Sequence, residues 1–444
     1  MNINIPDGAL FILNKLAQHD CRAYIVGGCV RDAIMGRACN DWDITTSALP
    51  QQTKDIFADK KVIETGIAHG TVTVIVDGEH YETTTFRADG EYTDHRHPDE
   101  VCFSRNIDDD LSRRDFTINA MAYSPQNGLV DLFGGVSDIS SKIIRAVGDP
   151  HKRFEEDALR ILRGLRFAAQ LGFKIEPDTR RAMFECSGLI SCLSGERIYQ
   201  EICKLIMGKY ALDVLIEYGD IIAAAVPEIA SSIGFDQKNK HHIYTVWDHT
   251  AYAVSNSPDD LICRLVMLLH DCGKPDTFTT DASGTGHFYG HAKISAAKAE
   301  GFFDRSGAGN SVKNRVCKLI YLHDCDIFCG ERSIRRWLGK LGQEDLLRLV
   351  DIKTADNMSQ APEYRGRIND LQIIRQKIGD IIAQKPCVEK SKLAVNGNDI
   401  MALGFCGAEI GHVLDELLDA VIESRCANTK DELISYALNL GRRD

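Results

Sequence analysis

Two aspartates separated by one residue are the first feature of this sequence that could do chemistry. Asp41 and Asp43 flank Trp42, and the apolar Ile44 follows. In a strand, side chains alternate between faces, so both carboxylates would point the same way and Trp42 the other. Two carboxylates so close repel each other unless they share a hard cation, and Mg²⁺ prefers oxygen ligands. We therefore predict a Mg²⁺ site at Asp41 and Asp43.

The neighbouring residues decide how this pair is interpreted, because most isolated Asp-x-Asp pairs are surface acids or caps. Upstream, residues 27–32 read Gly-Gly-Cys-Val-Arg-Asp, which makes Gly28 and Arg31 candidates for binding a triphosphate. Adjacent glycines let the backbone approach phosphates, and a helix start presents free amide donors. Magnesium ions can then activate a 3′-hydroxyl and neutralise the leaving pyrophosphate. Glu82 is either a third acid or a solvent-facing strand residue.

A second group of polar residues could bind the rest of a nucleotide. Arg113 and Arg114 are adjacent and are followed by Asp115 and Asn119. Two guanidinium groups offer forked donors for phosphate oxygens, while an aspartate and an asparagine can hold ribose hydroxyls. The alternative is a structural turn closed by salt bridges.

Asp157 and Arg160 could read the edge of a base. Residues three apart lie on one helix face, so the simplest alternative is an ion pair between them. An acceptor beside a donor fork matches cytosine and adenine, which present an amino donor beside a ring acceptor. Uracil and guanine present the reverse order, which leaves polar groups unpaired at roughly 1–3 kcal/mol each. The pair therefore predicts selection of C and A without a nucleic-acid template.

Basic residues are concentrated in the same part of the chain. They form either a solvated helix face or a local RNA groove, and they are Lys142, Arg145, Lys152, Arg153, Arg160, Arg163 and Arg166. The net charge of −12 argues against a general nucleic-acid coat but does not exclude such a groove.

Histidines and aspartates of the second half form another constellation. An adjacent His-Asp pair follows the apolar residues 267–269 and precedes Gly-Lys-Pro, and further histidines stand at 249, 291 and 323. Imidazole and carboxylate ligands suit a divalent transition metal, which could activate water for phosphoester hydrolysis. The alternative for each histidine is a hydrogen-bonded core residue. We assign the predicted metal site to His249, His270, Asp271 and Asp356.

The elements that must position these residues change in type near residue 150. The expected elements are a helix over 8–19, a strand over 23–26, a helix over 30–35, a strand over 42–44, and strands over 71–76 and 81–86 joined by the turn 77–79. Beyond Pro150 helical periodicity takes over. Breaks near 148–150, 236–239 and 385–386 predict a head at 1–148, a neck at 149–235, a body at 236–385 and a tail at 386–444.

The composition sets limits on the class of protein. A chain of 444 residues is too long for one core, so several domains are expected. Its apolar stretches are too short to span a bilayer. The 15 cysteines are odd in number and lack a framework spacing, which favours reduced thiols in the cytoplasm over a disulfide scaffold.

Taken in order, the head motifs resemble one known family. The series is 27–32, 41–43, 84–87, 113–122 and 156–160, followed by Arg163 and 166–168. It resembles the class II tRNA nucleotidyltransferase and bacterial poly(A) polymerase family within the DNA polymerase beta superfamily, densely over 20–205 and more thinly beyond. The resemblance implies an α/β head, a DNA polymerase beta-like nucleotidyltransferase with a small mixed sheet, followed by an all-α neck, body and tail.

The resemblance also implies roles for individual residues. Asp41 and Asp43 match the metal-binding catalytic acids. The nucleotide-binding positions are Gly28, Arg31, Arg114, Asp115, Asn119, Asp157, Arg160, Arg163 and Arg166. Residues 89–99 resemble the flexible loop that helps the family's site change from CTP to ATP, whereas 194–198 resemble a helix motif that supports the neck. The histidine constellation resembles the HD metal-dependent phosphohydrolase domain, and 393–401 resemble the tail that grips tRNA.

These motifs together predict a CCA-adding enzyme. It would add CMP, CMP and AMP to the tRNA 3′ end from CTP and ATP, with Mg²⁺ at the head and a second, divalent transition metal in the HD domain, where phosphohydrolase activity could also reside. The expected partners are tRNA, ATP and CTP, with no membrane and no obligate protein partner. The alternatives are a poly(A) polymerase, an HD phosphohydrolase with a nucleotide-sensing head, and a tRNA-binding chaperone, which the intact acids disfavour.

Overall fold

The chain forms two compact units, Met1–Pro227 and Glu228–Asp444. The computed structural model describes residues 3–39, 41–88, 102–239, 243–384, 387–423 and 425–440, so the loop expected at 89–99 lies outside the described residues. Within those residues no helix has both the length and the apolar character that a membrane crossing requires. The division into head, neck, body and tail stays a prediction.

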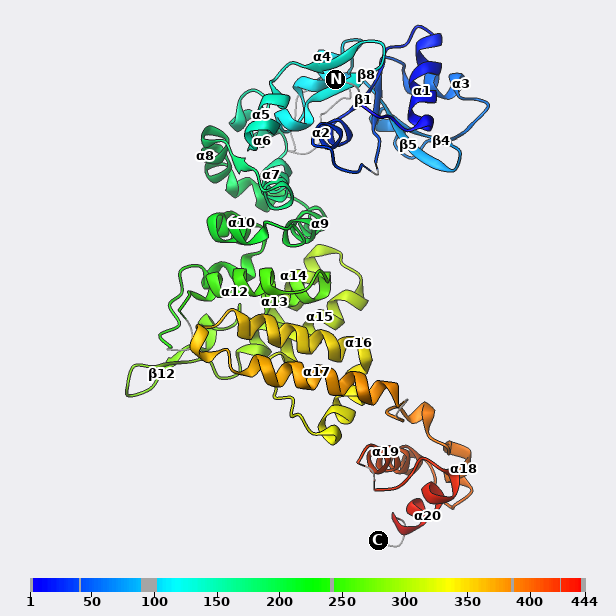
Figure 1. Cartoon of the computed structure of the whole chain (residues 1–444), viewed down its shortest axis with the longest axis vertical. Coiled ribbons are helices and arrows are strands. Elements are labelled where there is room, and N and C mark those ends of the chain that lie inside the picture. The colour runs from blue at the N-terminus through cyan, green and yellow to red at the C-terminus, as the bar shows by residue number, and fades with distance from the viewer. Residues whose placement is uncertain are drawn as a thin grey trace. The chain divides into compact units, whose positions relative to one another are not determined.

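A mixed sheet organises the first unit (Figure 1). Its seven strands follow the order β3 (Lys61–Ile63), β4 (Thr71–Val76), β5 (Glu79–Thr85), β2 (Ile44–Thr46), β1 (Ala23–Val26), β8 (Met121–Ser124) and β9 (Gly128–Asp131). β2 and β5 run parallel, whereas all other neighbours in the sheet are antiparallel. The small mixed sheet of the predicted head is therefore confirmed.

The β4–β5 hairpin places an acid beside the strand that follows the aspartate pair. Asp77 and Gly78 have φ of 52° and 87°, the left-handed backbone that a two-residue hairpin turn requires. β5 therefore begins at Glu79 and not at residue 81. Its parallel register with β2 pairs Thr83 with Ile44, which brings Glu82 next to the start of β2.

The aspartate pair itself does not lie in a strand, which corrects the sequence-based expectation. β2 begins at Ile44, and residues 41–43 precede it without strand pairing. The Asp43 carbonyl still accepts a hydrogen bond from the Val26 amide at 3.0 Å, so the chain is held against the end of β1. The alternation of faces therefore gives no information about the directions of Asp41 and Asp43.

Helices and short elements complete the first unit. The helices are α1 (Asp7–Gln18), α2 (Gly28–Ile34), α3 (Pro50–Ile56), α4 (Ile107–Ser112), α5 (Gly135–Ser141), α6 (Pro150–Glu156), α7 (Leu159–Leu171), α8 (Pro177–Glu185), α9 (Gly195–Ile206), α10 (Ala211–Glu217) and α11 (Gly219–Ala225). Two-residue strands pair as β6 (Arg87–Ala88) with β7 (Cys102–Phe103) and β10 (Ile143–Ile144) with β11 (Lys174–Ile175). The helix expected over 30–35 is α2, which begins at Gly28.

The second unit is helical apart from one two-residue pair, β12 (Thr279–Thr280) with β13 (Gly286–His287). Its helices are α12 (Val246–Asn256), α13 (Leu261–Leu269), α14 (His291–Ser306), α15 (Asn310–Leu322), α16 (Glu331–Met358), α17 (Arg367–Ala383), α18 (Gly397–Met401), α19 (Ala408–Ile422) and α20 (Lys430–Leu440). α16 and α17 lie side by side (Figure 1). Gly342 interrupts α16 with φ of 74°. The all-α character predicted beyond the head is confirmed.

Candidate functional site

A polar pocket of about 380 Å³ opens beside β2 and β5 in the first unit. Its lining combines acids with a large number of arginines: Asp43, Glu82, Asp115, Asp157, Arg87, Arg113, Arg114, Arg160, Arg163 and Arg197. Six of the predicted site residues are therefore together, namely Asp43, Arg114, Asp115, Asp157, Arg160 and Arg163. The mixture suits a ligand that carries both negative phosphates and bound cations.

The acids of this pocket repel one another. Burial raises the pKa of Asp43 to about 6, and the carboxylates of Glu82 and Asp41 raise it further while Arg114 lowers it. Glu82 is thus close enough to act electrostatically on Asp43, which favours its interpretation as a third acid. A cluster of carboxylates with a raised pKa lacks positive charge, and a hard divalent cation is the group that such oxygen donors fit. Asp41 is exposed and does not line the pocket.

Two arginines of the pocket are held by one buried acid, Asp110. Arg113 donates to Asp110 Oδ1 at 3.0 Å, and Arg114 donates to Oδ2 at 3.1 Å. Burial alone would raise the pKa of Asp110, but the adjacent Arg114 and Arg113 outweigh it and lower this pKa. Sequence reasoning missed Asp110, although its position three and four residues before the arginines on α4 was a usable signal.

Asp115 forms a second buried anchor. Its Oδ2 accepts from Arg163 at 2.7 Å, and its Oδ1 accepts from the Asn119 amide nitrogen at 3.3 Å. Burial alone would raise the pKa of Asp115, but Arg163 lowers it to about 2. Asn119 Oδ1 in turn accepts from Arg31 at 2.6 Å. The predicted residues Arg31, Asn119 and Asp115 are therefore connected, although only Asp115 lines the pocket.

The predicted base-reading pair has a different geometry from the one expected. α6 ends at Glu156, and Asp157 has φ of −149° and ψ of 101°, so Asp157 and Arg160 do not share one helix. Arg160 pairs with Glu156 at 2.6 Å. Asp157 Oδ1 accepts from the Leu159 amide, and its Oδ2 pairs with Arg197 on α9 at 2.8 Å. The ion pair expected between Asp157 and Arg160 is wrong, but both residues line the pocket.

Arg197 is the pocket residue that sequence reasoning assigned only to support of the neck. Its motif, residues 194–198, was visible, but nothing in the sequence indicated that it would reach Asp157 forty positions upstream. Arg166, by contrast, lies outside the pocket lining. It pairs with Glu201 at 3.2 Å and stacks over the ring of Phe167 at 4.3 Å from the ring centroid.

The glycines before α2 approach the same arginines. Gly27 has φ of 80°, and a Cβ atom built there would stand 3.0 Å from Arg114 Nη1. Only a residue without a side chain leaves that guanidinium its place and adopts this backbone freely. Gly28 begins α2 and does not line the pocket.

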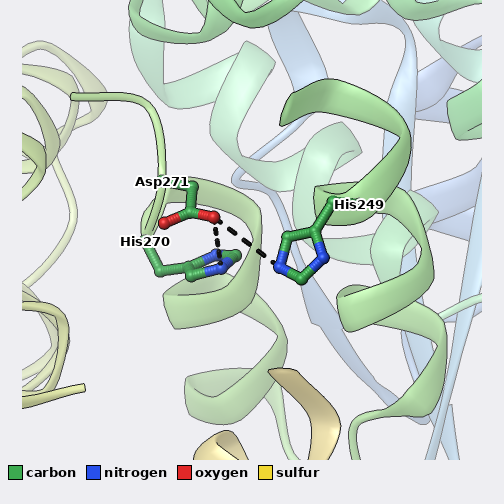
Figure 2. Close-up of side chains that lie close together, drawn as sticks. All are labelled: His249, His270 and Asp271. Carbon is green, nitrogen blue, oxygen red and sulfur yellow. Dashed lines mark ion pairs between the residues drawn. The ribbon is translucent and has the colours of Figure 1, made fainter. Parts of the chain in front are cut away.

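The predicted metal ligands of the second unit also meet. His249 and His270 approach Asp271 Oδ2 through their Nε2 atoms at 3.6 and 3.1 Å (Figure 2). Asp356 Oδ1 lies 2.9 Å from His249 Nε2 and 3.7 Å from His270 Nε2. Both histidines and Asp271 are buried. Burial alone would raise the pKa of Asp271, but His270 and Lys274 hold it well below its usual range.

Family models match most of the chain in four successive parts. Residues 23–145 match the poly A polymerase head domain, and residues 172–232 match a segment described as "Probable RNA and SrmB- binding site of polymerase A". Residues 240–361 match the HD domain. Residues 343–437 match a domain described as the second domain of tRNA nucleotidyltransferases.

Relatives resemble the chain over almost its whole length. The CCA-adding enzyme of Enterococcus faecalis is 48% identical over 428 residues, which cover 96% of this chain and 94% of that protein. The CCA-adding enzyme of Lactobacillus delbrueckii subsp. bulgaricus is 47% identical over 431 residues, 96% of each chain.

Solved structures have the same fold. The crystal structure of the Bacillus stearothermophilus CCA-adding enzyme in complex with CTP matches with a TM-score of 0.77 and 29% identity, over 98% of this chain and 97% of its own. The Thermotoga maritima CCA-adding enzyme complexed with tRNA matches with a TM-score of 0.58 over 99% of each chain, and at 19% identity that likeness is one of fold alone.

The Asp115–Arg163 pair leads to a prediction about stability. Asp115 has a pKa of about 2 in the folded chain against 3.8 for the model carboxyl, so Asp115→Asn should lower the free energy of unfolding by about 2 kcal/mol at pH 7. Because the folded pKa is depressed, the difference should be complete above pH 4 and disappear as the pH falls towards 2. Urea unfolding followed by circular dichroism measures it.

The control is Asp178→Asn, which removes a carboxylate that pairs with Arg181 on the surface. Exposed pairs contribute little, so this variant should unfold like the unchanged protein. An Asp115→Asn variant as stable as the control at pH 7 would show that the buried pair does not support the fold.

Proposed function

The chain belongs to the family of CCA-adding enzymes, and we propose that the pocket beside β2 and β5 is where it joins C, C and A to the 3′ end of tRNA. The protein is a template-independent nucleotidyltransferase that takes CMP and AMP from CTP and ATP and releases pyrophosphate. The observation that carries the assignment to this pocket is its lining, where Asp43 and Glu82 face a group of arginines within about 380 Å³.

The acids at the start of β2 are the proposed Mg²⁺ ligands. Asp41 and Asp43 would hold the ion, and Glu82 stands where it can share the charge. The repulsion that raises the pKa of Asp43 supports this assignment, because a cation between the carboxylates would remove it. When bound, Mg²⁺ neutralises the phosphate charge and favours ionisation of the tRNA 3′-hydroxyl.

The arginines are the proposed triphosphate ligands. Arg113 and Arg114 keep their guanidinium groups oriented through Asp110, so they lose little freedom when they donate to phosphate oxygens. Gly28 would let the backbone approach the phosphates. Arg163 would bind near them while it pairs with Asp115.

Three predicted nucleotide-binding residues are proposed to act through their neighbours. Arg31 donates to Asn119, and Asn119 donates to Asp115. Arg166 pairs with Glu201, which fixes α7 against α9. We therefore assign Arg31, Asn119 and Arg166 to the positioning of Asp115 and of α7, and direct contact with the sugar to Asp115.

Base selection is proposed to depend on Asp157 and Arg160, with Arg197 as a positioning residue. Asp157 is an acceptor for the amino group that cytosine and adenine share, and Arg160 is a donor for the neighbouring ring acceptor. Arg197 holds the Asp157 carboxylate at 2.8 Å. Because uracil and guanine present the opposite order, this arrangement would discriminate against them by roughly 1–3 kcal/mol per unpaired group.

The second unit is proposed to bind a divalent transition metal through His249, His270, Asp271 and Asp356. Nitrogen and oxygen ligands together favour a softer ion than Mg²⁺, and the four side chains converge without any rearrangement of their helices. An HD phosphohydrolase with a nucleotide-sensing head is the alternative function. The acids and arginines assembled in the first unit favour a working transferase.

The direct test is incorporation of labelled nucleotides into tRNA that lacks its 3′ terminal CCA. We expect CMP to be added from CTP alone and AMP to follow only when CTP is also present. Addition of long AMP runs without any CMP would identify a poly(A) polymerase instead. If replacement of Asp271 and not of Asp41 abolished the physiological activity, the phosphohydrolase alternative would be correct.

The metal-binding acids should be indispensable for both kinds of addition. We expect Asp43→Asn to reduce CMP and AMP incorporation on the order of 10³-fold, because the neutral amide cannot balance the charge of a metal ion. tRNA binding, measured by gel shift, should be unchanged. The control is Asp55→Asn on α3, whose carboxylate accepts from Gln51 on the surface. Equal loss of activity in both variants would remove Asp43 from the catalytic site.

Replacing the base-reading acid should relax specificity without abolishing the reaction. Asp157→Ala should raise UMP incorporation relative to CMP by roughly 10- to 100-fold, because the acceptor that rejects the uracil edge is gone. Arg197→Met should cause a smaller change in the same direction, since it only frees the carboxylate. The two effects should not add in the double variant.

The ratio of kcat/KM for UTP to that for CTP measures this effect. The control pair is Asp178→Ala and Arg181→Met, an exposed aspartate and arginine that also form an ion pair. Full additivity of the Asp157 and Arg197 effects would show that Arg197 does not act through Asp157.

A further inference from the structure

Four histidines and two aspartates converge in the second unit, two more side chains than the proposed metal site uses. The additional residues are His291 at the start of α14 and His323 at the end of α15, and both are buried. We infer that this cluster binds two divalent transition-metal ions, with the Asp271 carboxylate as the bridge between them. The inference rests on the single-metal site proposed above and extends it by a second ion with its own ligands.

The two oxygens of Asp271 face different pairs of histidines. Oδ2 lies near His249 and His270, at the distances given above, whereas Oδ1 lies 3.4 Å from His291 Nε2 and 3.8 Å from His323 Nε2. Each triad of Asp271 with two histidines has its ligand atoms within 4.8 Å of one another. A carboxylate that offers one oxygen to each side is the usual bridge in sites whose metal ions lie about 3.5–4 Å apart.

Hydrogen bonds fix all four imidazole rings in the orientation that a metal requires. Each Nδ1 faces a backbone carbonyl, and the pairs are His249 with Ser359 at 3.2 Å, His270 with Met267 at 2.8 Å, His291 with Phe288 at 2.9 Å and His323 with Ile320 at 2.6 Å. A carbonyl can only accept, so each Nδ1 carries the proton. In the neutral rings every Nε2 therefore presents its lone pair to the centre of the cluster.

Such a centre is unfavourable without cations. His291 Nε2 and His323 Nε2 lie 3.2 Å apart, so that two lone pairs would face each other. His270 Nε2 is buried without a hydrogen-bond partner, which costs about 1–3 kcal/mol when nothing replaces water. The Lys274 ammonium stands 2.7 Å from Asp271 Oδ2, but it leaves Oδ1 and its two histidines unsatisfied. A metal ion on each side would satisfy both groups.

The ligand set also indicates the kind of ion and an open coordination position. Four imidazoles with two carboxylates favour first-row transition ions over Mg²⁺ or Ca²⁺. Asp271, His291, His323 and Asp356 line one wall of a pocket of about 310 Å³. Both ions would therefore face a space that can admit water, as catalytic metal sites do and closed structural sites do not.

The test measures metal stoichiometry and magnetic coupling in the full chain, prepared without a histidine tag. The protein is stripped with a chelator, loaded with Mn²⁺, freed of excess ion and analysed by mass spectrometry and electron paramagnetic resonance. We expect about two Mn²⁺ per chain and the signal of an exchange-coupled pair. An ion held by the head acids would give an uncoupled signal, so the coupling identifies the bridged pair without any variant.

Variants then assign the ligands. The double variant His291→Ala, His323→Ala should retain one Mn²⁺ and lose the coupling, while Asp271→Ala should lose both ions. The control is His412→Ala, an exposed histidine outside the cluster, which should keep two coupled ions. Circular dichroism checks that each variant is folded.

Two results would overturn the inference and are distinguishable. One uncoupled ion that remains in the double variant would exclude the second site and leave the single-metal proposal intact. Absence of any ion that depends on Asp271 would exclude both. Neither result bears on nucleotide addition by the first unit, which the tRNA assay measures separately.

Discussion

Asp110 is the buried charge on which the geometry of the nucleotide pocket depends. It is fully buried, and its two oxygens hold Arg113 and Arg114, while Oδ1 also accepts from the Arg87 backbone amide at 3.3 Å. One carboxylate thus ties α4 to the segment that follows β5. Removing it would leave two arginines near each other without a counter-charge, which is costly in a poorly solvated site. The acids of β2 and β5 can face the arginines because this anchor is in place.

The pocket as a whole follows one electrostatic rule, in which each arginine is oriented by an acid behind it. Asp115 holds Arg163, Glu156 holds Arg160, and the Arg197–Asp157 pair closes the far side. Such pairs preorganise the donors before substrate arrives, so binding costs less ordering of long side chains. The acids near β2 have no comparable partner except Arg114, and their pKa values respond accordingly. That asymmetry separates the place for phosphate from the place for a cation.

Sequence reasoning located most of this pocket but not its wiring. Ordered motifs were enough to bring Asp43, Arg114 and Asp115 to one site, because each lies beside a strand or helix end with a clear local signal. Asp157 shows the limit. An aspartate two residues before Leu159 can cap a helix start, yet the regular spacing to Arg160 favoured one continuous helix. The true partner, Arg197, is set by the packing of α7 on α9, a long-range contact that no local pattern contains.

The two metal sites differ in a way that follows from their ligands and not from their size. Oxygen donors near an exposed Asp41 bind a hard ion weakly enough for it to arrive with each nucleotide and leave with pyrophosphate. Buried imidazoles with fixed Nδ1 protons bind transition ions far more tightly, in the order set by ligand softness. The first unit therefore needs an ion that exchanges at every addition, whereas the second retains what it binds. Because neither ligand set suits the other's ion, one chain can use both metals without cross-loading.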